Sequence, residues 1–269
     1  MSKVWLDHEE HCLSAESLRA LFENKIACIR IRGFATAQES EAFVGAMDDI
    51  GLSHEYKVLG PNVKHRPRYL GVPQFEYRKR PKADYFATVE RAYAEQRAVF
   101  ERCRFDPLER LSQALRVACP GHSVGVAEEP GYGRYFAGII RDTTGGTNLH
   151  MDYARVSASD YSIAANDAQI ATNFYASGTD EGGETTVYNL HFVPPAMPPG
   201  QVFEISPFRE EWIAGCESHT FKPIPGDLVM FNSRCPHRVH WNPRDDGQRR
   251  TGMGTFIGRR PGGDLVLWS

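Results

Sequence analysis

The chain has 269 residues, of which 41% are hydrophobic and 24% charged, and its formal net charge at pH 7 is −3. A chain of this length and ordinary composition can bury a substantial core. The near-neutral charge gives no global basic field for nucleic acid, and no apolar stretch suits a signal peptide or a membrane span. We therefore expect a cytoplasmic protein without nucleic-acid or membrane partners, either a monomer or a homodimer.

The first part of the chain predicts helices and one strand. A short run of β-branched and apolar residues at 27–32, which ends before Gly33, favours a strand. Capping residues and apolar residues at helical spacing favour helices. The expected helices follow Ser14, follow the capping box of Thr36 and Glu39, and cover about 82–117 with a break near Pro107.

The second half predicts short strands separated by Gly, Pro, Asn and Asp turns. The expected strands are Tyr135–Ile140, Ala168–Tyr175, Thr185–Asn189, His219–Lys222, Asp227–Phe231 and Thr255–Ile257. Many short strands favour a double-stranded β-helix, the cupin-like jelly roll. We predict a mainly β, α+β fold in one domain, 1–269, with a helical N-terminal layer to about 125 and a jelly-roll core over about 130–260. The Pro-rich segment 194–200 is a candidate lid.

The most informative motif is His150 and Asp152. On a strand, side chains two residues apart point the same way, so both can bind one metal ion. Two imidazoles and one carboxylate hold iron(II) on one face and leave the other face free for reaction. His237 is favoured as the third ligand, because it follows a predicted strand and precedes an arginine pair by about a dozen residues. His240 and His219 remain alternatives.

Two nearby residues have a simpler interpretation. Cys235 lies two positions before His237, but iron(II) sites that activate oxygen prefer imidazole and carboxylate, so a structural role is expected. The six cysteines form no CxxC motif or paired spacing, which is typical of reduced thiols. His191 follows a predicted strand and could line the pocket, although a packed or hydrogen-bonded histidine is favoured.

A 2-oxoglutarate co-substrate needs a cation for the carboxylate that does not chelate iron, and arginine binds carboxylate with two parallel hydrogen bonds. Arg249 and Arg250 are adjacent, so on a strand only one can face the ligand. Arg249 would share its face with Thr251, a possible second donor, whereas Arg250 would share its face with glycines that leave room. Arg250 is slightly favoured and both stay open. Asn173 and Tyr175 share a strand face and could reach the co-substrate or simply pack.

In combination, these motifs resemble the iron- and 2-oxoglutarate-dependent dioxygenases, including their prolyl hydroxylase-like branch. The segments that carry this likeness are Glu181–Thr185, Pro225–Phe231, His237 and Arg249–Thr251. A narrower resemblance, from about residue 65 to the end, is to the free-standing alkaloid halogenases of hapalindole-type pathways and to related N-substituted amino-acid β-hydroxylases. It rests on Asp84–Ala87, Gly182–Glu184, Val187–Leu190, Gly226–Asn232, His237–Val239 and Trp268–Ser269.

One position separates the two reaction types in these families. The halogenases have glycine or alanine where the hydroxylases have the carboxylate ligand, because chloride takes that coordination position. This chain has Asp152 there. The resemblance therefore implies hydroxylation of an unactivated C–H bond by iron(II), 2-oxoglutarate and O2, with release of succinate and CO2.

The substrate is the least constrained part of the prediction. In the resembling enzymes, a helical segment that corresponds to about 66–78 helps to cover the active site. Candidate substrate contacts are the aromatic Tyr69, Phe75, Tyr77 and Tyr153, and the cations Arg66, Arg68, Arg78 and Arg155. A small acidic molecule such as an N-acylated amino acid is favoured, and an alkaloid or nucleoside-like metabolite stays open. The alternatives are a peptide or protein hydroxylase and a non-catalytic, cupin-like metal- or sugar-binding protein.

Overall fold

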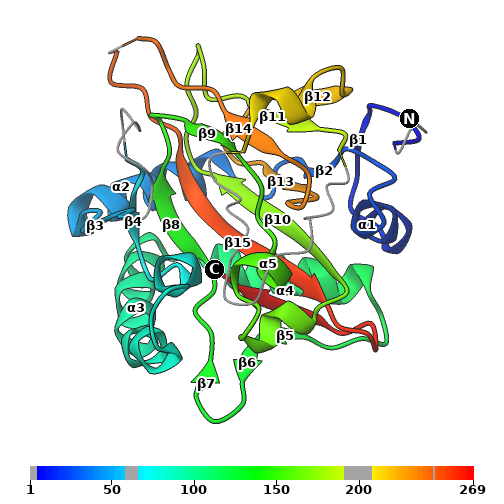
Figure 1. Cartoon of the computed structure of the whole chain (residues 1–269). Helices are drawn as coiled ribbons and strands as arrows, with labels where there is room; N and C mark the ends of the chain where they lie inside the picture. The colour runs from blue at the N-terminus through cyan, green and yellow to red at the C-terminus, as the bar shows by residue number, and fades with distance from the viewer. Residues whose placement is uncertain (1–4, 58–65, 191–207, 245) are drawn as a thin grey trace.

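The structure is a computed structural model that describes residues 5–57, 66–190, 208–244 and 246–269 (Figure 1). Most of its strands form one large sheet, in the order β1-β2-β13-β10-β15-β8-β4-β3, and β16 pairs with β15 and β5 beside this path. Its bounds are β1 Glu10–His11, β2 Cys28–Ile31, β3 His54–Glu55, β4 Arg68–Leu70, β5 Val124–Val126, β8 Ile139–Asp142, β10 Ala168–Tyr175, β13 Leu228–Phe231, β15 Thr251–Arg259 and β16 Leu265–Trp268.

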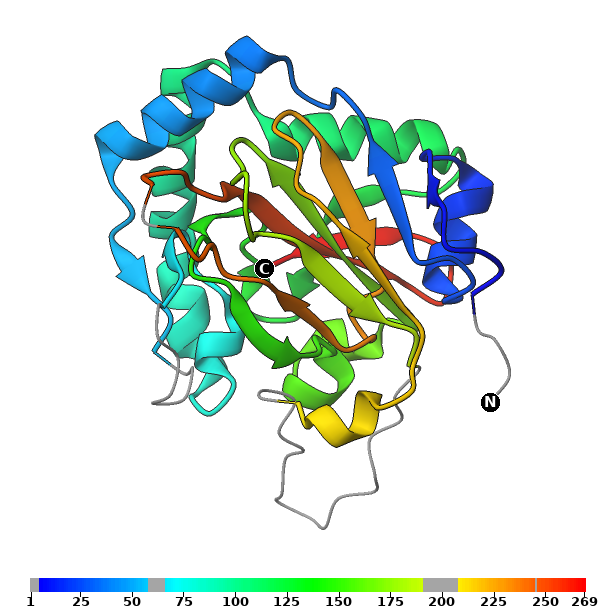
Figure 2. The same cartoon turned by 90° about the horizontal axis from the view of Figure 1, so that it is seen from above.

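A smaller sheet lies across one face of the large one, in the order β12-β11-β14-β9, and helices cover the opposite face (Figure 2). Its strands are β9 Thr147–His150, β11 Thr185–Tyr188, β12 Ser218–Phe221 and β14 His237–Val239, and a separate hairpin joins β6 Glu128–Glu129 to β7 Gly133–Arg134. The helices are α1 Ala15–Phe22, α2 Ala37–Ile50, α3 Lys82–Cys103, α4 Pro107–Ala118, α5 Ala154–Ser157 and the 3-10 turns η1 Gln74–Tyr77, η2 Ser162–Ala165 and η3 Glu210–Ile213. The predicted α+β jelly roll with an N-terminal helical layer is confirmed.

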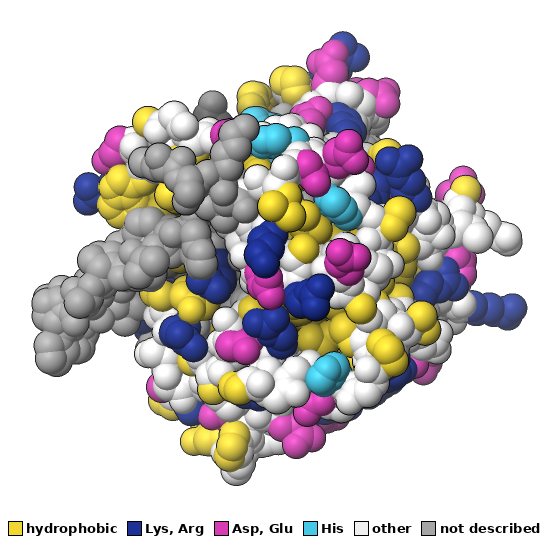
Figure 3. Space-filling view, turned by 90° about the vertical axis from the view of Figure 1, so that its right-hand side faces the viewer, with side chains coloured by type: hydrophobic (Ala, Val, Ile, Leu, Met, Phe, Trp, Pro, Cys, Tyr) yellow, Lys and Arg dark blue, Asp and Glu magenta, His cyan; other side chains and the backbone are white. Residues whose placement is uncertain are grey.

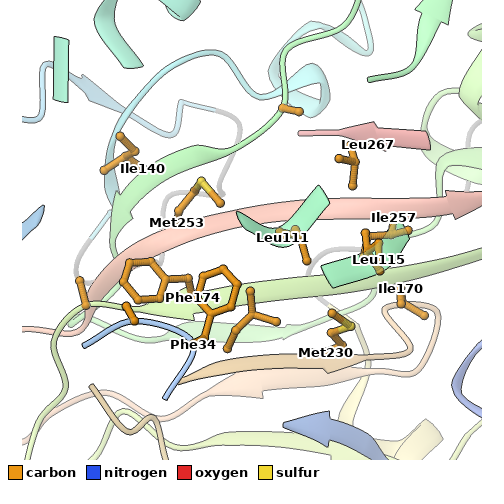
Figure 4. Packing of buried hydrophobic residues seen from close by; sticks show 14 of the residues in the cluster. Phe34, Leu111, Leu115, Ile140, Ile170, Phe174, Met230, Met253, Ile257 and Leu267 are labelled. Atoms are coloured by element: carbon orange, nitrogen blue, oxygen red, sulfur yellow. The ribbon is translucent and has the colours of Figure 1, made fainter. Parts of the chain in front are cut away.

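The largest apolar core lies between the helices and the large sheet. Leu111 and Leu115 of α4 pack over the side chains that β10 and β13 present to this face, among them Phe174 and Met230 (Figure 4). Because side chains alternate along a strand, the same β10 turns Asn173 toward the smaller sheet. The whole of β10 is buried. The helical layer therefore leaves the other face of the sheet free to build a pocket.

The capping residues and the proline correctly predicted where three helices begin. Ser14 and Thr36 each form a capping box at the start of a helix, α1 and α2 respectively. Pro107 is the first residue of α4, where its missing N–H costs nothing, so the helical pattern breaks there as predicted.

Several strand predictions were wrong in extent. The strand expected from Tyr135 begins only at Ile139, and the strand expected at Thr255–Ile257 extends over Thr251–Arg259. The strands β9, β14 and β16 were not predicted. The segment 66–78 contains β4 and the short η1 rather than a covering helix. The candidate lid 194–200 and His191 lie outside the described residues, and the single-domain extent stays a prediction.

Within the described part of the chain, no helix is both long and apolar enough to cross a membrane. The face seen in Figure 3 carries lysine and arginine side chains interspersed with aspartate and glutamate. Mixed charges of this kind provide no continuous basic surface on that face.

Candidate active site

The three predicted metal ligands converge at the neighbouring strands β9 and β14 of the smaller sheet. His150 and His237 are direct cross-strand partners, with ring centroids 4.2 Å apart. The carboxylate Oδ2 of Asp152 lies 3.9 Å from Nε2 of His150 and 3.5 Å from Nε2 of His237. One ligand atom from each side chain lies within 4.8 Å of the others, so a single metal ion fits between them.

Backbone carbonyls fix the orientation of both imidazoles. Nδ1 of His150 lies 2.7 Å from the carbonyl oxygen of Asn148, and Nδ1 of His237 lies 2.9 Å from that of Cys235. A carbonyl oxygen only accepts hydrogen bonds, so each Nδ1 must carry the proton and donate it. Both Nε2 atoms then keep their lone pairs toward Asp152, which is the tautomer that a metal ion requires.

Asp152 is not on a strand, which corrects the prediction. β9 ends at His150, and Asp152 lies in the loop that leads to α5. Its backbone N–H donates to the carbonyl of Ser233 at 2.8 Å, and its own carbonyl accepts from Nε2 of Gln169 and Oγ of Ser233, each at 3.1 Å. Gln169, which is 3% exposed, and Ser233 therefore position the carboxylate through its backbone.

The electrostatics of the cluster favour metal binding. Burial, together with the neighbouring His237, lowers the pKa of His150 to about 4, so its imidazole is neutral at pH 7. Burial raises the pKa of Asp152, but the neighbouring His237, His150 and Arg141 side chains bring it below the ordinary value. Neutral imidazole and ionised carboxylate are the protonation states that bind a divalent metal.

The cluster opens into a pocket of about 330 Å³ between the two sheets, a size that suits a small molecule. Most of the residues of the large sheet that line it come from β8, β10 and β15, and β13 and β16 add one residue each. They include Arg141, Asn173 and Gly254.

Arg250 also lines this pocket, whereas Arg249 does not. The side chain of Arg250 is 5% exposed and donates to the carbonyl of Gly183 at 3.0 Å and to the hydroxyl of Thr185 at 3.0 Å. No carboxylate among the described residues forms an ion pair with it. Arg249 instead pairs with Asp48 on the surface, at 2.6 and 2.7 Å. Of the two adjacent arginines, Arg250 is thus the buried cation that faces the pocket without an anionic partner.

The other predicted co-substrate contacts have different surroundings. The hydroxyl of Tyr175 accepts from Arg250 at 3.2 Å, and Asn173 lines the pocket. Thr251 is buried, but its hydroxyl lies 2.6 Å from the hydroxyl of Ser177 and does not line the pocket. The sequence missed Thr143, whose hydroxyl accepts from the guanidinium of Arg250 and which does line the pocket.

The predicted substrate contacts divide into two groups. Phe75 and Tyr153 line the pocket. Tyr69 and Tyr77, with Arg66 and Arg68, line a separate groove that shares Tyr56 with the pocket. Arg78 lies over the ring of Phe75 at 4.0 Å, and Arg155 donates to the carbonyl of Asn166 at 3.5 Å. Neither arginine lines the pocket.

Solved structures of other proteins have a similar fold. The chain resembles an N-substituted L-amino acid dioxygenase from Burkholderia ambifaria, with a TM-score of 0.57, 16% identity and coverage of 95% of this chain and 91% of that one. It also resembles SnoN, a non-haem α-ketoglutarate-dependent epimerase of nogalamycin biosynthesis, with a TM-score of 0.53, 14% identity and coverage of 93% and 86%. At 16% and 14% identity, these likenesses show that the chain shares the fold of these enzymes.

Sequence comparison gives the family. A family model described as the carrier-protein-independent halogenase WelO5 matches residues 2–261, so the chain belongs to the WelO5 family. The leucinostatins biosynthesis cluster protein S of Purpureocillium lilacinum is 30% identical over 209 residues, which are 74% of this chain and 84% of that protein. The L-γ-glutamyl-L-propargylglycine hydroxylase of Streptantibioticus cattleyicolor is 33% identical over 171 residues, 61% of this chain and 59% of that enzyme. The resemblance to the iron- and 2-oxoglutarate-dependent oxygenases, stated from the sequence, is thereby confirmed.

Proposed function

We propose that this protein hydroxylates an unactivated C–H bond of a small molecule, an amino-acid derivative or another specialised metabolite. The observation that carries the proposal is the cluster of His150, Asp152 and His237, whose ligand atoms lie within 4.8 Å of one another at the wall of a small-molecule pocket. Two oriented imidazoles and one carboxylate match the donor set that non-haem iron(II) oxygenases use.

The residues present fit both the metal and its co-substrate. His150, Asp152 and His237 would hold iron(II), and Arg250 would bind the distal carboxylate of 2-oxoglutarate. A buried guanidinium without an anionic partner is costly, and a carboxylate removes that cost. When bound, iron(II) with 2-oxoglutarate and O2 supplies the oxidation, with release of succinate and CO2.

The protein's own part in this reaction is orientation and exclusion of water. The carbonyls of Asn148 and Cys235 hold the imidazole tautomers, and Gln169 with Ser233 holds the loop of Asp152. Apolar side chains that include Ile139, Phe75 and Phe256 line the same pocket, where they exclude water from the reacting carbon. Substrate is thereby directed toward the open side of the metal ligands.

Asp152 is the reason for proposing hydroxylation in a family whose model is named for a halogenase. Its carboxylate lies within 3.9 Å of both histidine Nε2 atoms, so it stands where a third protein ligand would occupy the coordination position that a halide needs. The propargylglycine hydroxylase and the N-substituted amino acid dioxygenase that resemble this chain are named for small amino-acid derivatives, which supports that substrate class.

The test is turnover under ¹⁸O2 in the presence of chloride. The purified protein, iron(II) and 2-oxoglutarate are incubated with a panel of N-acyl amino acids and γ-glutamyl dipeptides, and products are analysed by mass spectrometry. We expect succinate formation coupled to a product that has gained one ¹⁸O atom. A chlorinated product, or an isomerised product without added oxygen, would contradict hydroxylation while leaving the oxygenase class intact.

A further inference from the structure

We propose that the pocket contains a second anion site, formed by Arg141 with Tyr56 and Asn173, that binds a carboxylate of the organic substrate. The inference rests on the proposed function, because it assigns Arg250 to 2-oxoglutarate and leaves Arg141 for a different molecule. It narrows the substrate class to compounds that carry a carboxylate close to the carbon that is oxidised.

Three adjacent strands place the Arg141 guanidinium inside the pocket. β8, β15 and β10 lie side by side in the large sheet (Figure 1), and Arg141 on β8 reaches across β15 to Asn173 on β10. Its Nη2 donates to Oδ1 of Asn173 at 2.7 Å. Gly254 lies beneath this contact, and a Cβ atom there would be only 2.8 Å from Nη2 of Arg141 and 3.1 Å from Oδ1 of Asn173. A side chain at position 254 would therefore force the Arg141 guanidinium to move.

Arg141 has donors available for a ligand. An arginine carries five N–H donors, and Arg141 is hydrogen-bonded to Asn173 and to the hydroxyl of Tyr56. Both partners are neutral, so they orient the guanidinium without neutralising it. The hydroxyl of Tyr56 can also donate to a carboxylate beside the arginine.

The side chains that line the pocket include one more cation than the co-substrate uses. The charged side chains among its described lining are Arg141, Arg250 and Asp152. Iron(II) with Asp152 and the dianion 2-oxoglutarate carries one net negative charge, which Arg250 neutralises. Arg141 is then the remaining cationic side chain of the pocket, and a partly buried cation gains from pairing with the carboxylate of a substrate.

Several arginines of this chain form ion pairs with carboxylates. Arg249 pairs with Asp48, Arg238 with Glu210 and Arg30 with Glu10, all at 2.6 to 2.8 Å. Among the described residues, no such ion pair is recorded for Arg141 or for Arg250, the two arginines of the pocket. Both guanidiniums face the pocket, so their charge is available to ligand carboxylates.

The test compares carboxylates with their neutral carboxamides. The anaerobic protein is loaded with iron(II) and 2-oxoglutarate and titrated by calorimetry with a panel of N-acetyl-L-amino acids and the corresponding N-acetyl amino-acid amides. We expect at least one acid to bind about tenfold or more tightly than its amide, as for a lost charge-assisted hydrogen bond. Arg141→Gln should abolish the preference. Arg155→Gln, outside the pocket, is the matched control and should retain it.

The same samples separate failure of this site from failure of the proposed function. The visible charge-transfer band of the iron–2-oxoglutarate chelate is recorded before each titration, and Arg141→Gln should form it at the wild-type 2-oxoglutarate concentration. A normal band with no acid preferred over its amide would overturn the second anion site alone. If Arg141→Gln lost the band and Arg250→Gln kept it, Arg141 would be the residue that binds 2-oxoglutarate. That result would overturn the proposal of a substrate site at Arg141. A wild type without the band would refute the proposed function itself.

Discussion

Two clusters of potential metal ligands exist in the described part of this chain, and only one has the surroundings of a metal site. His150, Asp152 and His237 form the first, and Glu10, Cys28 and His219 form the second. Both place their ligand atoms within 4.8 Å of one another. The first opens into the pocket between the sheets, whereas none of the second lines that pocket.

Electrostatics explain the difference. In the second cluster Glu10 is held by two hydrogen bonds from Arg30, at 2.6 and 2.8 Å, so a guanidinium already occupies the place of a cation. Burial, with the nearby charge of Glu10, raises the pKa of Cys28 to about 12, so its thiol is protonated at neutral pH. In the first cluster His150 is neutral and Asp152 is ionised. Ligand identity and spacing therefore do not define a metal site unless protonation states and competing cations also allow it.

The largest expected effect contrasts one histidine from each cluster. His237→Ala removes a ligand of the open cluster and should weaken iron(II) binding more than the hundredfold typical for loss of an outer-shell partner. His219→Ala should leave iron binding unchanged. Anaerobic dialysis followed by iron analysis measures both variants. Loss of iron in His219→Ala, with normal iron content in His237→Ala, would show that the second cluster is the metal site and contradict this assignment.

The next effect separates the adjacent arginines. Arg250→Gln removes the buried cation of the pocket and should weaken 2-oxoglutarate binding about tenfold to hundredfold, the range for a charge-assisted hydrogen-bonded pair. Arg249→Gln breaks only the surface pair with Asp48 and should have no effect on co-substrate affinity. Titration of the charge-transfer band gives both affinities. Equal losses of 2-oxoglutarate affinity in the two variants would contradict the assignment of Arg250 as the residue that binds its distal carboxylate.

A third prediction concerns the stabilising role of the second cluster. Glu10→Gln leaves the Arg30 guanidinium, whose side chain is 3% exposed, with Asp227 as its remaining carboxylate partner at 3.1 Å. We expect a loss of about 1–3 kcal/mol in the free energy of unfolding, measured in urea, because a buried charge loses its partner. Glu9→Gln, at an exposed neighbouring position, is the control. Unchanged stability with reduced iron content in Glu10→Gln would make this cluster a metal site instead.

The smallest expected effect is on thiol reactivity. Exposed Cys12 should react with iodoacetamide in the native protein, whereas Cys28 should not, because only the thiolate is nucleophilic and burial blocks access. With a Cys28 pKa of about 12, raising the pH from 7 to 9 should leave that cysteine unlabelled. Peptide mass spectrometry reads the labels. Labelling of Cys28 that increases over this pH range would indicate a thiolate, and hence a capable metal ligand.

The three residues that the sequence analysis selected as metal ligands lie together in the structure, whereas several of those selected for the substrate do not line the pocket. His150, Asp152 and His237 were selected by order and spacing, and alternation along a strand favoured Arg250 because glycines share its face. These signals depend on local chain geometry, which a sequence encodes. The strands β9 and β14 that carry the histidines were nevertheless not predicted, because they are short and contain polar residues that resemble turns.

The remaining pocket residues could not be predicted because they depend on which distant segments meet. Arg141 was missed because the preceding strand was expected to end at Ile140, although Ile139, Arg141 and Thr143 alternate toward the pocket. Tyr69 and Tyr77 were expected to line the active site, yet they line the neighbouring groove. Aromatic composition alone does not indicate which of two adjacent cavities a side chain enters.

The most direct test of the central claim is an anaerobic titration of the wild-type protein with iron(II) and then 2-oxoglutarate, monitored by visible absorption. The open cluster and the buried Arg250 predict a weak charge-transfer band that saturates with 2-oxoglutarate and is absent with iron(II) alone. Bound iron without any such band would contradict the oxygenase assignment and leave a metal-binding jelly roll without catalysis.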